Sequence, residues 1–370
     1  MDDLSPPVLA EPVSAAVASP HGRHAAIEAG RTIPVAAGVH WVRLPLPFAP
    51  GHINCWVLDD GDGWTIVDTG YECDDAMRVW DDLFTGDFAA RPVRRVVCTH
   101  MHPDHAGLAG WLTRRWNCPL WMSVQEYLMC RALLTDVAQE PPQDGVEFYQ
   151  AAGMGERAVS IYRKRFGPYR TGFSALPASY RRIRAGENLP IGPSDWRVVM
   201  TSGHSPEHAC LWNEALDLFI SGDQVLPRYW SNVTVLPIEP DADPLADWVE
   251  SLHRIRRTVP DSVTVLPSHG EPFTGLHARV GALVGGHERN LLALLGALSV
   301  PKRAADVLDT LFAWPIRGET SLGMAVGESL AHLAWLVRRG FATRLADAER
   351  VDWYRATPAG AALTSIPWEN

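Results

Sequence analysis

Six consecutive residues in the first half of the chain carry a dense group of metal-binding side chains. His100, His102 and His105 place three imidazoles beside the carboxylate of Asp104. Without a cation, protonated imidazoles this close would repel one another, whereas a divalent ion uses neutral imidazole and ionised carboxylate as ligands. In an extended or turning segment, His100 and His102 point the same way, and Asp104 and His105 can serve a neighbouring ion. The cluster therefore predicts a metal site.

Three later residues of the same types stand near the ends of apolar runs. His204, Asp223 and His269 each follow such a run within a few residues, as His100 does. In layered α/β proteins, sites are assembled at strand ends and in the loops beyond them. A single histidine is more often a hydrogen-bonded residue without a ligand role, and the chain has 14. The four endings taken together favour one shared metal site.

The elements that must position these residues follow from hydrophobic patterning. Several strands open the chain, and strands then alternate with helices, which indicates an α/β fold with helices packed on sheets. Strands are expected over residues 39–44, 53–58, 64–67, 96–98, 196–200, 216–220 and 263–266, and helices over 74–84, 107–116, 244–258 and 276–298.

The same patterning suggests how the chain is organised. Residues 1–35 read as a loose N-terminal arm, 36–275 as the catalytic domain, and 123–190 as a helical insertion or lid within it. Residues 276–370 read as a helical, winged-helix-like module. Its expected elements are helices over 304–312 and 327–339 and strands over 342–346 and 351–355.

Together the motifs resemble the metallo-β-lactamase superfamily over about residues 39–269. The matching motifs are Asp68-Thr69-Gly70, H-x-H-x-D-H at 100–105, Gly203-His204, Gly222-Asp223 and Ser268-His269-Gly270. The resemblance implies a four-layer αββα sandwich and two divalent metal ions. It implies one ion held by His100, His102 and His204, a second held by Asp104, His105 and His269, and a bridge formed by Asp223. The resemblance places Asp68 near the metals, where we expect it to orient a ligand, although it could simply close the turn before Gly70.

The resemblance also implies hydrolysis. Two ions that share a water can activate it as a hydroxide for attack on the carbonyl carbon of a small ester, thioester or lactone. True β-lactamases of the superfamily lack the aspartate bridge, so Asp223 argues against antibiotic hydrolysis. A metal-dependent ribonuclease or phosphodiesterase is the alternative, and a metal-binding scaffold without catalysis is a third. Zinc suits the nitrogen and oxygen ligands best, with iron or manganese admissible.

Other residues are candidates for contacts with the substrate or for proton transfer. Asp104 is the first candidate for delivering a proton to the leaving group, and Tyr229 is a weaker one that could equally pack beside Trp230. Arg228 is close enough in sequence to reach an anionic group of the substrate, or it forms a surface ion pair. The aromatic insertion has the composition of a lid over an apolar moiety, and also that of ordinary amphipathic helices.

Composition narrows the function classes further. The chain of 370 residues carries 33 Lys+Arg and 43 Asp+Glu, a net charge of −10, which disfavours nucleic acid as a partner. It has no apolar stretch long enough for a membrane span and no secretory signal at its start, so we expect a cytoplasmic enzyme of a small-molecule substrate. The six cysteines form no C-x-x-C pair and read as reduced thiols. Within the C-terminal module, residues 297–370 carry equal numbers of basic and acidic residues. We therefore expect the module to pack against the rest of the chain, to form a homodimer or to line the substrate pocket.

Overall fold

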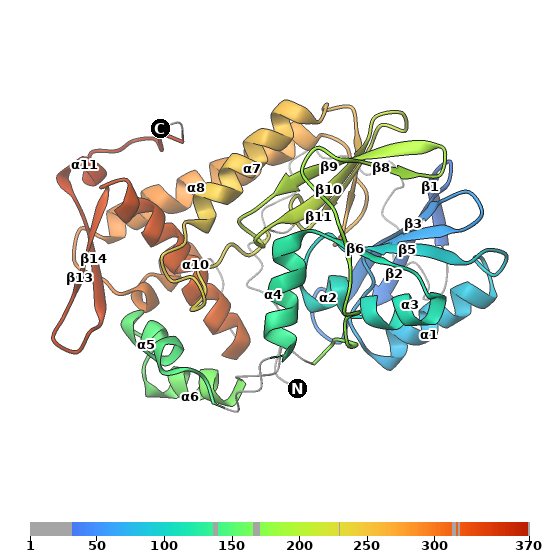
Figure 1. Ribbon diagram of the computed structural model, residues 1–370. Coiled ribbons are helices and arrows are strands. Elements are labelled where there is room, and N and C mark those ends of the chain that lie inside the picture. Colours follow the sequence, from blue (N-terminus) through green and yellow to red (C-terminus); the bar gives the residue numbers. More distant parts are fainter. Residues whose placement is uncertain are drawn as a thin grey trace.

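Two β-sheets face each other in the computed structural model, which describes residues 32–135, 140–165, 171–228, 230–312, 316 and 319–368 (Figure 1). The first sheet has seven strands in the order β1-β2-β3-β4-β5-β6-β7. Its first four strands are antiparallel, and β4 to β7 run parallel. Its strands are β1 (Thr32–Ala36), β2 (Val39–Pro45), β3 (His52–Asp59), β4 (Trp64–Val67), β5 (Val93–Val97), β6 (Leu120–Met122) and β7 (Arg181–Arg182).

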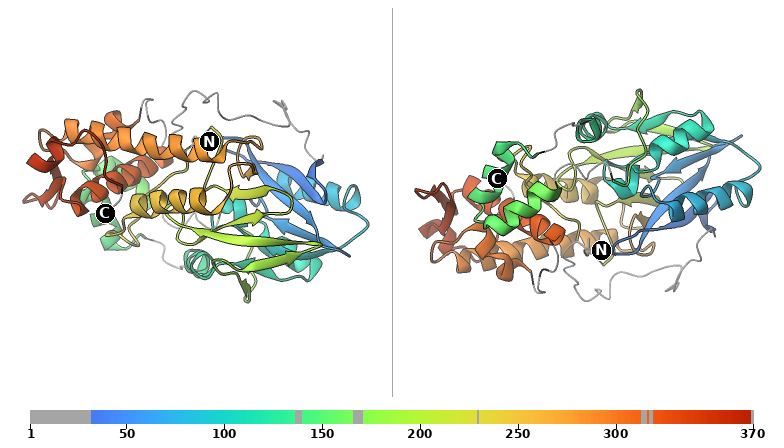
Figure 2. Two further views of the ribbon diagram at one scale, coloured as in Figure 1. Left: turned by 90° about the horizontal axis from the view of Figure 1, so that it is seen from above. Right: turned by 90° about the horizontal axis from the view of Figure 1, so that it is seen from below.

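The second sheet has five strands in the order β12-β11-β10-β9-β8. Strands β8 to β11 are antiparallel in sequence order, and β12 runs parallel to β11. Its strands are β8 (Asn188–Ile191), β9 (Ser194–Thr201), β10 (His208–Asn213), β11 (Leu218–Gly222) and β12 (Thr264–Pro267). Figure 2 shows the blue strands of the first sheet and the yellow-green strands of the second as separate layers.

Helices cover the outer face of each sheet. On the first sheet they include α1 and α3, and on the second α7 and α8 (Figure 2). The helices that precede the tail are α1 (Asp74–Thr85), α2 (Pro103–Ala106), α3 (Ala109–Trp116), α4 (Val124–Thr135), α5 (Gln143–Ala151), α6 (Glu156–Arg165), α7 (Pro244–Thr258) and α8 (Leu276–Ala297). The tail adds the 3-10 turn η2 (Ala304–Asp306), α9 (Leu308–Leu311), α10 (Glu319–Arg338), the hairpin β13 (Ala342–Ala346) and β14 (Asp352–Ala356), and α11 (Pro358–Ala361).

The period of two along the strands explains the layering. In β3, Trp56 and Leu58 enter the core between the sheets, whereas Cys55 and Val57 enter the core under the helices. Successive side chains of a strand point to opposite faces, so a strand that is apolar on both faces must be covered on both sides. The predicted four-layer αββα arrangement is therefore confirmed.

The structure corrects three of the expected boundaries. Residues 32–35 are not part of a loose arm, because they belong to β1, while residues 1–31 lie outside the described residues. Within the described residues of the insertion 123–190, the last helix ends at Arg165; β7 then belongs to the first sheet and β8 to the second. The helix expected over 304–312 is two short pieces, η2 and α9, because Val307 between them leaves the helical conformation.

The C-terminal elements share a core with the second sheet. Phe219 of β11, Leu283 of α8 and Trp335 of α10 belong to one buried apolar cluster. Ala152 and Met154, which follow α5, join the same cluster, so this part of the insertion packs on the tail and not on the first sheet. No helix in the described part of the chain is both long and apolar enough to span a bilayer.

Candidate metal centre

The strands that precede the predicted residues all end at one edge of the sandwich. In the first sheet, β4 and β5 are parallel and their carboxyl ends are in register, with Val67 opposite Val97. In the second sheet, β9 and β11 run the same way because both are antiparallel to β10, and β12 is parallel to β11. The carboxyl ends of these strands therefore lie together, and the residues that follow them are Asp68, His100, His204, Asp223 and His269.

Hydrogen bonds join the two sheets at this edge. The Thr99 carbonyl accepts the backbone N–H of Ala209, at 2.9 Å, across the sandwich. The side-chain amide of Asn54, which is fully buried in β3, donates to the carbonyls of Pro267 at 2.9 Å and Gly270 at 2.8 Å. These contacts fix the loop that carries His269 against the first sheet.

The seven residues proposed as ligands lie close together. Three groups have ligand atoms within 4.8 Å of one another, and they are His100, His102 and His204; His100, His105 and Asp223; and Asp104, His105 and His269. The Asp223 carboxylate faces both histidine sets, with Oδ2 3.4 Å from His204 Nε2 and 3.5 Å from His105 Nε2. Asp104 Oδ2 lies 3.2 Å from His269 Nε2.

The second ring nitrogen of each of three histidines is held by an acceptor. His105 Nδ1 lies 2.8 Å from Asp68 Oδ2, His204 Nδ1 lies 2.8 Å from the carbonyl oxygen of Asn232, and His269 Nδ1 lies 2.9 Å from that of His52. Each acceptor requires a proton on Nδ1, which leaves the lone pair of the neutral ring on Nε2. This is the arrangement by which proteins orient histidines that ligate metals.

Three of the atoms that point into the cluster lack hydrogen-bond partners, whereas His100 Nε2 and His102 Nδ1 lie 2.9 Å from each other. His105 Nε2, His204 Nε2 and Asp223 Oδ1 are buried without one. A buried polar atom left unpaired costs about 1–3 kcal/mol, so three in one place need an explanation. Two ligands on one tetrahedral zinc ion, with bonds of about 2.0–2.1 Å, lie about 3.3 Å apart. The observed separations of 3.2–3.6 Å fit such a cation.

The electrostatics of the cluster favour positive charge beside its carboxylates. Burial would lower the pKa of His105 and His269, but the Asp223 carboxylate and its neighbours outweigh it and raise the pKa of both rings, a charge that a bound cation would replace. Burial, followed by the neighbouring imidazoles of His105 and His102, holds the pKa of His100 well below its usual value. Burial alone would raise the pKa of Asp223, but His105 and His269 outweigh it and hold that pKa well below its usual value. Neutral imidazole and ionised carboxylate are the forms that bind divalent cations.

Asp68 sits behind His105, as a residue that orients a ligand would. Its side chain is buried and accepts hydrogen bonds from the backbone N–H of Thr99 at 2.8 Å and from the Thr99 hydroxyl. Its φ of +60° is in the left-handed region, which a short polar side chain tolerates better than a bulky one. Asp68 therefore both forms the turn before Gly70 and contacts His105, so the two interpretations of this residue are compatible.

Of the two candidates for contact with the substrate, Arg228 and Tyr229, the structure describes only Arg228. Arg228 Nη2 lies 3.5 Å from Glu271 Oε2, so the guanidinium has a carboxylate partner two residues beyond His269. Tyr229 lies outside the described residues.

Sequence reasoning missed two buried residues beside the cluster. His208, at the start of β10, accepts the backbone N–H of Asp223 at Nε2, at 3.2 Å, and its ring stacks on His100 with centroids 4.9 Å apart. Its signal was its position four residues after His204, on a strand that was not predicted. Glu126 on α4 accepts the backbone N–H groups of Met101 at 2.9 Å and Glu207 at 2.8 Å. A glutamate in a helix normally reads as exposed, so nothing in the pattern marked it.

Glu126 ties together the loops that carry His102 and His204, and its loss should destabilise the fold. We expect Glu126→Ala to lower the free energy of unfolding by about 2–4 kcal/mol, because two backbone N–H groups lose their acceptor. Urea unfolding monitored by circular dichroism measures the change. The exposed neighbour gives the control Gln125→Ala, which should stay within about 0.5 kcal/mol of the unaltered protein. Equal stability of both variants would refute this role.

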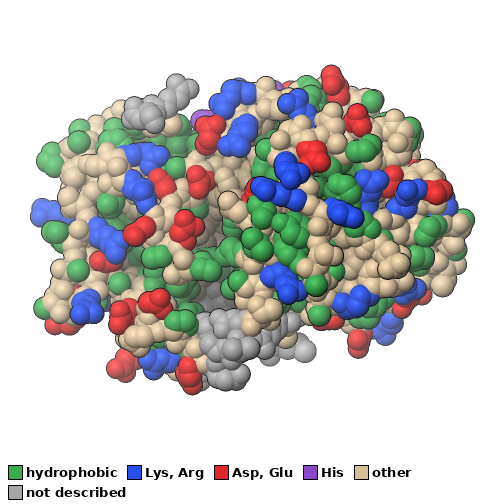
Figure 3. Space-filling model, in the orientation of Figure 1, with side chains coloured by type: hydrophobic (Ala, Val, Ile, Leu, Met, Phe, Trp, Pro, Cys, Tyr) green, Lys and Arg blue, Asp and Glu red, His purple; other side chains and the backbone are tan. Residues whose placement is uncertain are grey.

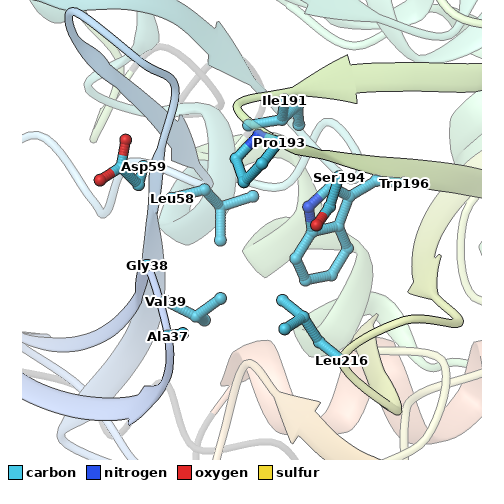
Figure 4. Close-up of a pocket in the computed structure, with 10 residues that line it drawn as sticks. All are labelled: Ala37, Gly38, Val39, Leu58, Asp59, Ile191, Pro193, Ser194, Trp196 and Leu216. Carbon is cyan, nitrogen blue, oxygen red and sulfur yellow. The ribbon is translucent and has the colours of Figure 1, made fainter.

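A cavity between the sheets lies at the other end of the sandwich. It has a volume of about 270 Å³ and is lined mainly by apolar side chains, including Val39, Leu58, Trp196 and Leu216 (Figure 4). Trp196 is at the start of β9 and Leu58 is near the end of β3, whereas the candidate ligands lie beyond the opposite ends of these strands. The cavity contains none of the candidate ligands.

Comparison with known families and proteins covers most of the chain. The family described as "Metallo-beta-lactamase superfamily" matches residues 49–269, and the one described as "Metallo-beta-lactamase-like, C-terminal domain" matches residues 291–357. The "Probable metallo-hydrolase YqjP" of Bacillus subtilis (strain 168) is 27% identical over 302 residues, which cover 79% of this chain and 90% of that protein.

Solved structures extend the similarity over both parts of the molecule. The crystal structure of a beta-lactamase domain protein from Burkholderia ambifaria has 37% sequence identity and a TM-score of 0.83, and covers 92% of this chain and 97% of that chain. A metallo-beta-lactamase family protein from Thermus thermophilus has 24% identity and a TM-score of 0.73, and covers 88% of this chain and 100% of that chain. The second likeness supports the fold alone.

Proposed function

The chain belongs to the metallo-β-lactamase superfamily, and from that premise we propose that it is a binuclear metal-dependent hydrolase of small esters, thioesters or lactones. The observation that carries the proposal is the set of buried, unpartnered nitrogen and oxygen atoms that meet at one edge of the sandwich. The relative named as a metallo-hydrolase supports the general class of reaction.

We assign the ligands in two sets that share one carboxylate. His100, His102 and His204 would hold one ion, and Asp104, His105 and His269 the other. Asp223 would bind both, because its oxygens face histidines of each set. Nitrogen and oxygen donors suit zinc, and also iron or manganese. When bound, two such ions supply an activated water and polarise the carbonyl oxygen of the substrate.

The protein's own residues orient the ligands and handle the proton. Asp68, Asn232 and His52 hold the Nδ1 atoms of three ligands, so that their Nε2 atoms face the site. The Asp104 side chain is 15% exposed, against 10% for Asp223, so it is the more accessible carboxylate of the cluster. We therefore assign Asp104 the role of accepting a proton from the attacking water and passing it to the leaving group.

A panel of substrates with and without added zinc tests the proposal. We expect metal-dependent turnover of aryl esters, acyl thioesters or lactones, and rates at least about tenfold lower for bis-p-nitrophenyl phosphate, single-stranded RNA and a chromogenic β-lactam. Basic and acidic side chains are interspersed on the face shown in Figure 3, which gives a polyanion no continuous basic surface there. RNA cleavage faster than hydrolysis of every carbonyl substrate would overturn the proposal in favour of a nuclease.

A further inference from the structure

Helix α10 of the C-terminal module lies directly against the segment 230–235, which follows the Asp223 loop. The backbone N–H of Val235 donates to the carbonyl of Gly327 at 3.1 Å. A Cβ atom at Gly327 would come within 2.2 Å of the Thr234 side chain, so only glycine permits this approach. The backbones of the two elements are therefore locked together.

A second helix of the tail holds the start of the same segment. The Trp230 ring lies over Gly286 of α8, where a Cβ atom would come within 1.5 Å of it, and its centroid is 5.0 Å from that of His287. Segment 230–235 is thus seated between α8 and α10.

Glu328 makes the polar contact between α10 and this segment. Its carboxyl Oε2 accepts a hydrogen bond from Asn232 Nδ2 at 3.0 Å, and the residue is only 5% exposed. The Thr234 hydroxyl donates to Asn232 Oδ1, so the side chain of Asn232 is held at both of its ends. The side chains therefore fix where the Asn232 backbone lies.

The Asn232 backbone in turn contacts one of the candidate metal ligands. Its carbonyl oxygen is the acceptor for His204 Nδ1 at 2.8 Å. One residue earlier, the Ser231 hydroxyl donates to the carbonyl of Asp223. Two hydrogen bonds thus separate a carboxyl group of the C-terminal module from a ligand of the site.

We propose that the C-terminal module is a structural part of the metal centre, with Glu328 acting through Asn232 as a positioning residue for His204. The inference rests on the proposed function, because it requires His204 to be a metal ligand. It gives the tail a role that depends on neither nucleic acid nor a second copy of the chain. Without the Glu328 contact, the carbonyl that orients His204 would be free to shift, and the ion on His100, His102 and His204 would bind more weakly.

The protonation of Glu328 supplies a matched pair of variants. Burial raises the pKa of Glu328 to about 8, so the carboxyl group is mostly neutral at pH 7. Glutamine has nearly the same shape, is neutral and still offers an oxygen to Asn232. Leucine fills a similar volume but offers no acceptor. Glu328→Gln should therefore preserve the positioning that Glu328→Leu removes.

Zinc affinity measured by competition with a chromophoric chelator tests the inference. We expect Glu328→Leu and Asn232→Ala each to weaken the binding of one of two ions about tenfold, the double variant to be little worse than either, and Glu328→Gln to stay within about twofold. Ser329→Ala is the control, because that buried hydroxyl donates to Ala325 within α10. Thermal unfolding of the metal-free variants checks that each protein is folded.

A second readout follows His204 itself. In the zinc-loaded protein, the Nδ1–H proton of His204 should give an NMR signal that shifts in Glu328→Leu and Asn232→Ala but not in Glu328→Gln or Ser329→Ala. If the unaltered protein binds two ions and both disruptive variants bind them equally well, the inference is wrong and the proposed function stands. If the unaltered protein binds no metal, both are wrong.

Discussion

Replacing Asp223 by alanine should lower the rate of carbonyl hydrolysis by at least about a thousandfold, which corresponds to about 4 kcal/mol of transition-state stabilisation. The carboxylate is the group that faces both histidine sets, with Oδ2 near His204 and His105 and Oδ1 3.6 Å from His269 Nε2. Its loss removes the ligand that the two proposed ions share. Steady-state kinetics on the best substrate of the panel measure the change.

Two further variants make this result specific. Asp223→Asn keeps the shape of the side chain without its charge, and we expect it to lose most of the activity while the fold is retained. Asp195→Ala removes an exposed carboxylate at the other end of the sandwich, at the start of β9, and should leave the rate unchanged. A folded Asp223→Ala protein with more than a tenth of the unaltered rate would refute the bridging assignment.

Removing metal with a chelator should reduce hydrolysis at least about a hundredfold and lower the melting temperature, and adding zinc should restore both. The unpartnered atoms His105 Nε2, His204 Nε2 and Asp223 Oδ1 would gain partners when an ion binds. A ligand that binds only the folded state at a thousand times its dissociation constant stabilises that state by about 4 kcal/mol.

Calorimetry with and without zinc measures this stabilisation. In Asp223→Ala, zinc should raise the melting temperature much less than in the unaltered protein, because a shared ligand is missing. Unchanged activity and an unchanged melting temperature after complete removal of metal would show that the cluster is not a metal site.

The clustering of the seven candidate ligands could be predicted because its signal is local. Three histidines and an aspartate within six residues are visible without any knowledge of the fold, and His204, Asp223 and His269 follow apolar runs that do form β9, β11 and β12. The α/β class followed from the alternation of strand and helix patterns, whereas the four-layer sandwich was implied by the resemblance to the superfamily.

The residues that contact the candidate ligands could not be predicted, because their signal depends on tertiary contacts. Asn232 and Glu328 are 96 residues apart, and Glu126 is 81 residues from Glu207. Each is an ordinary polar residue in its local sequence and gains its role only when helix and loop pack together. His208 lies only four residues after His204, but β10 was not predicted. The sequence therefore did not indicate that the His208 side chain points toward Asp223.

Short and irregular elements were also missed, for related reasons. Strands β6 and β7 have three and two residues, too few to show a period. The break between η2 and α9 follows a turn in which the Asp306 carboxylate accepts the Arg303 backbone N–H at 3.0 Å, a local contact that competes with a continuous helix.

The metal content of the purified protein tests the central claim most directly. After reconstitution with zinc and removal of free ions, mass spectrometry of the elements should find two zinc ions per chain in the unaltered protein and fewer in Asp223→Ala. A content near zero in the unaltered, folded protein would contradict the assignment of these seven residues as ligands.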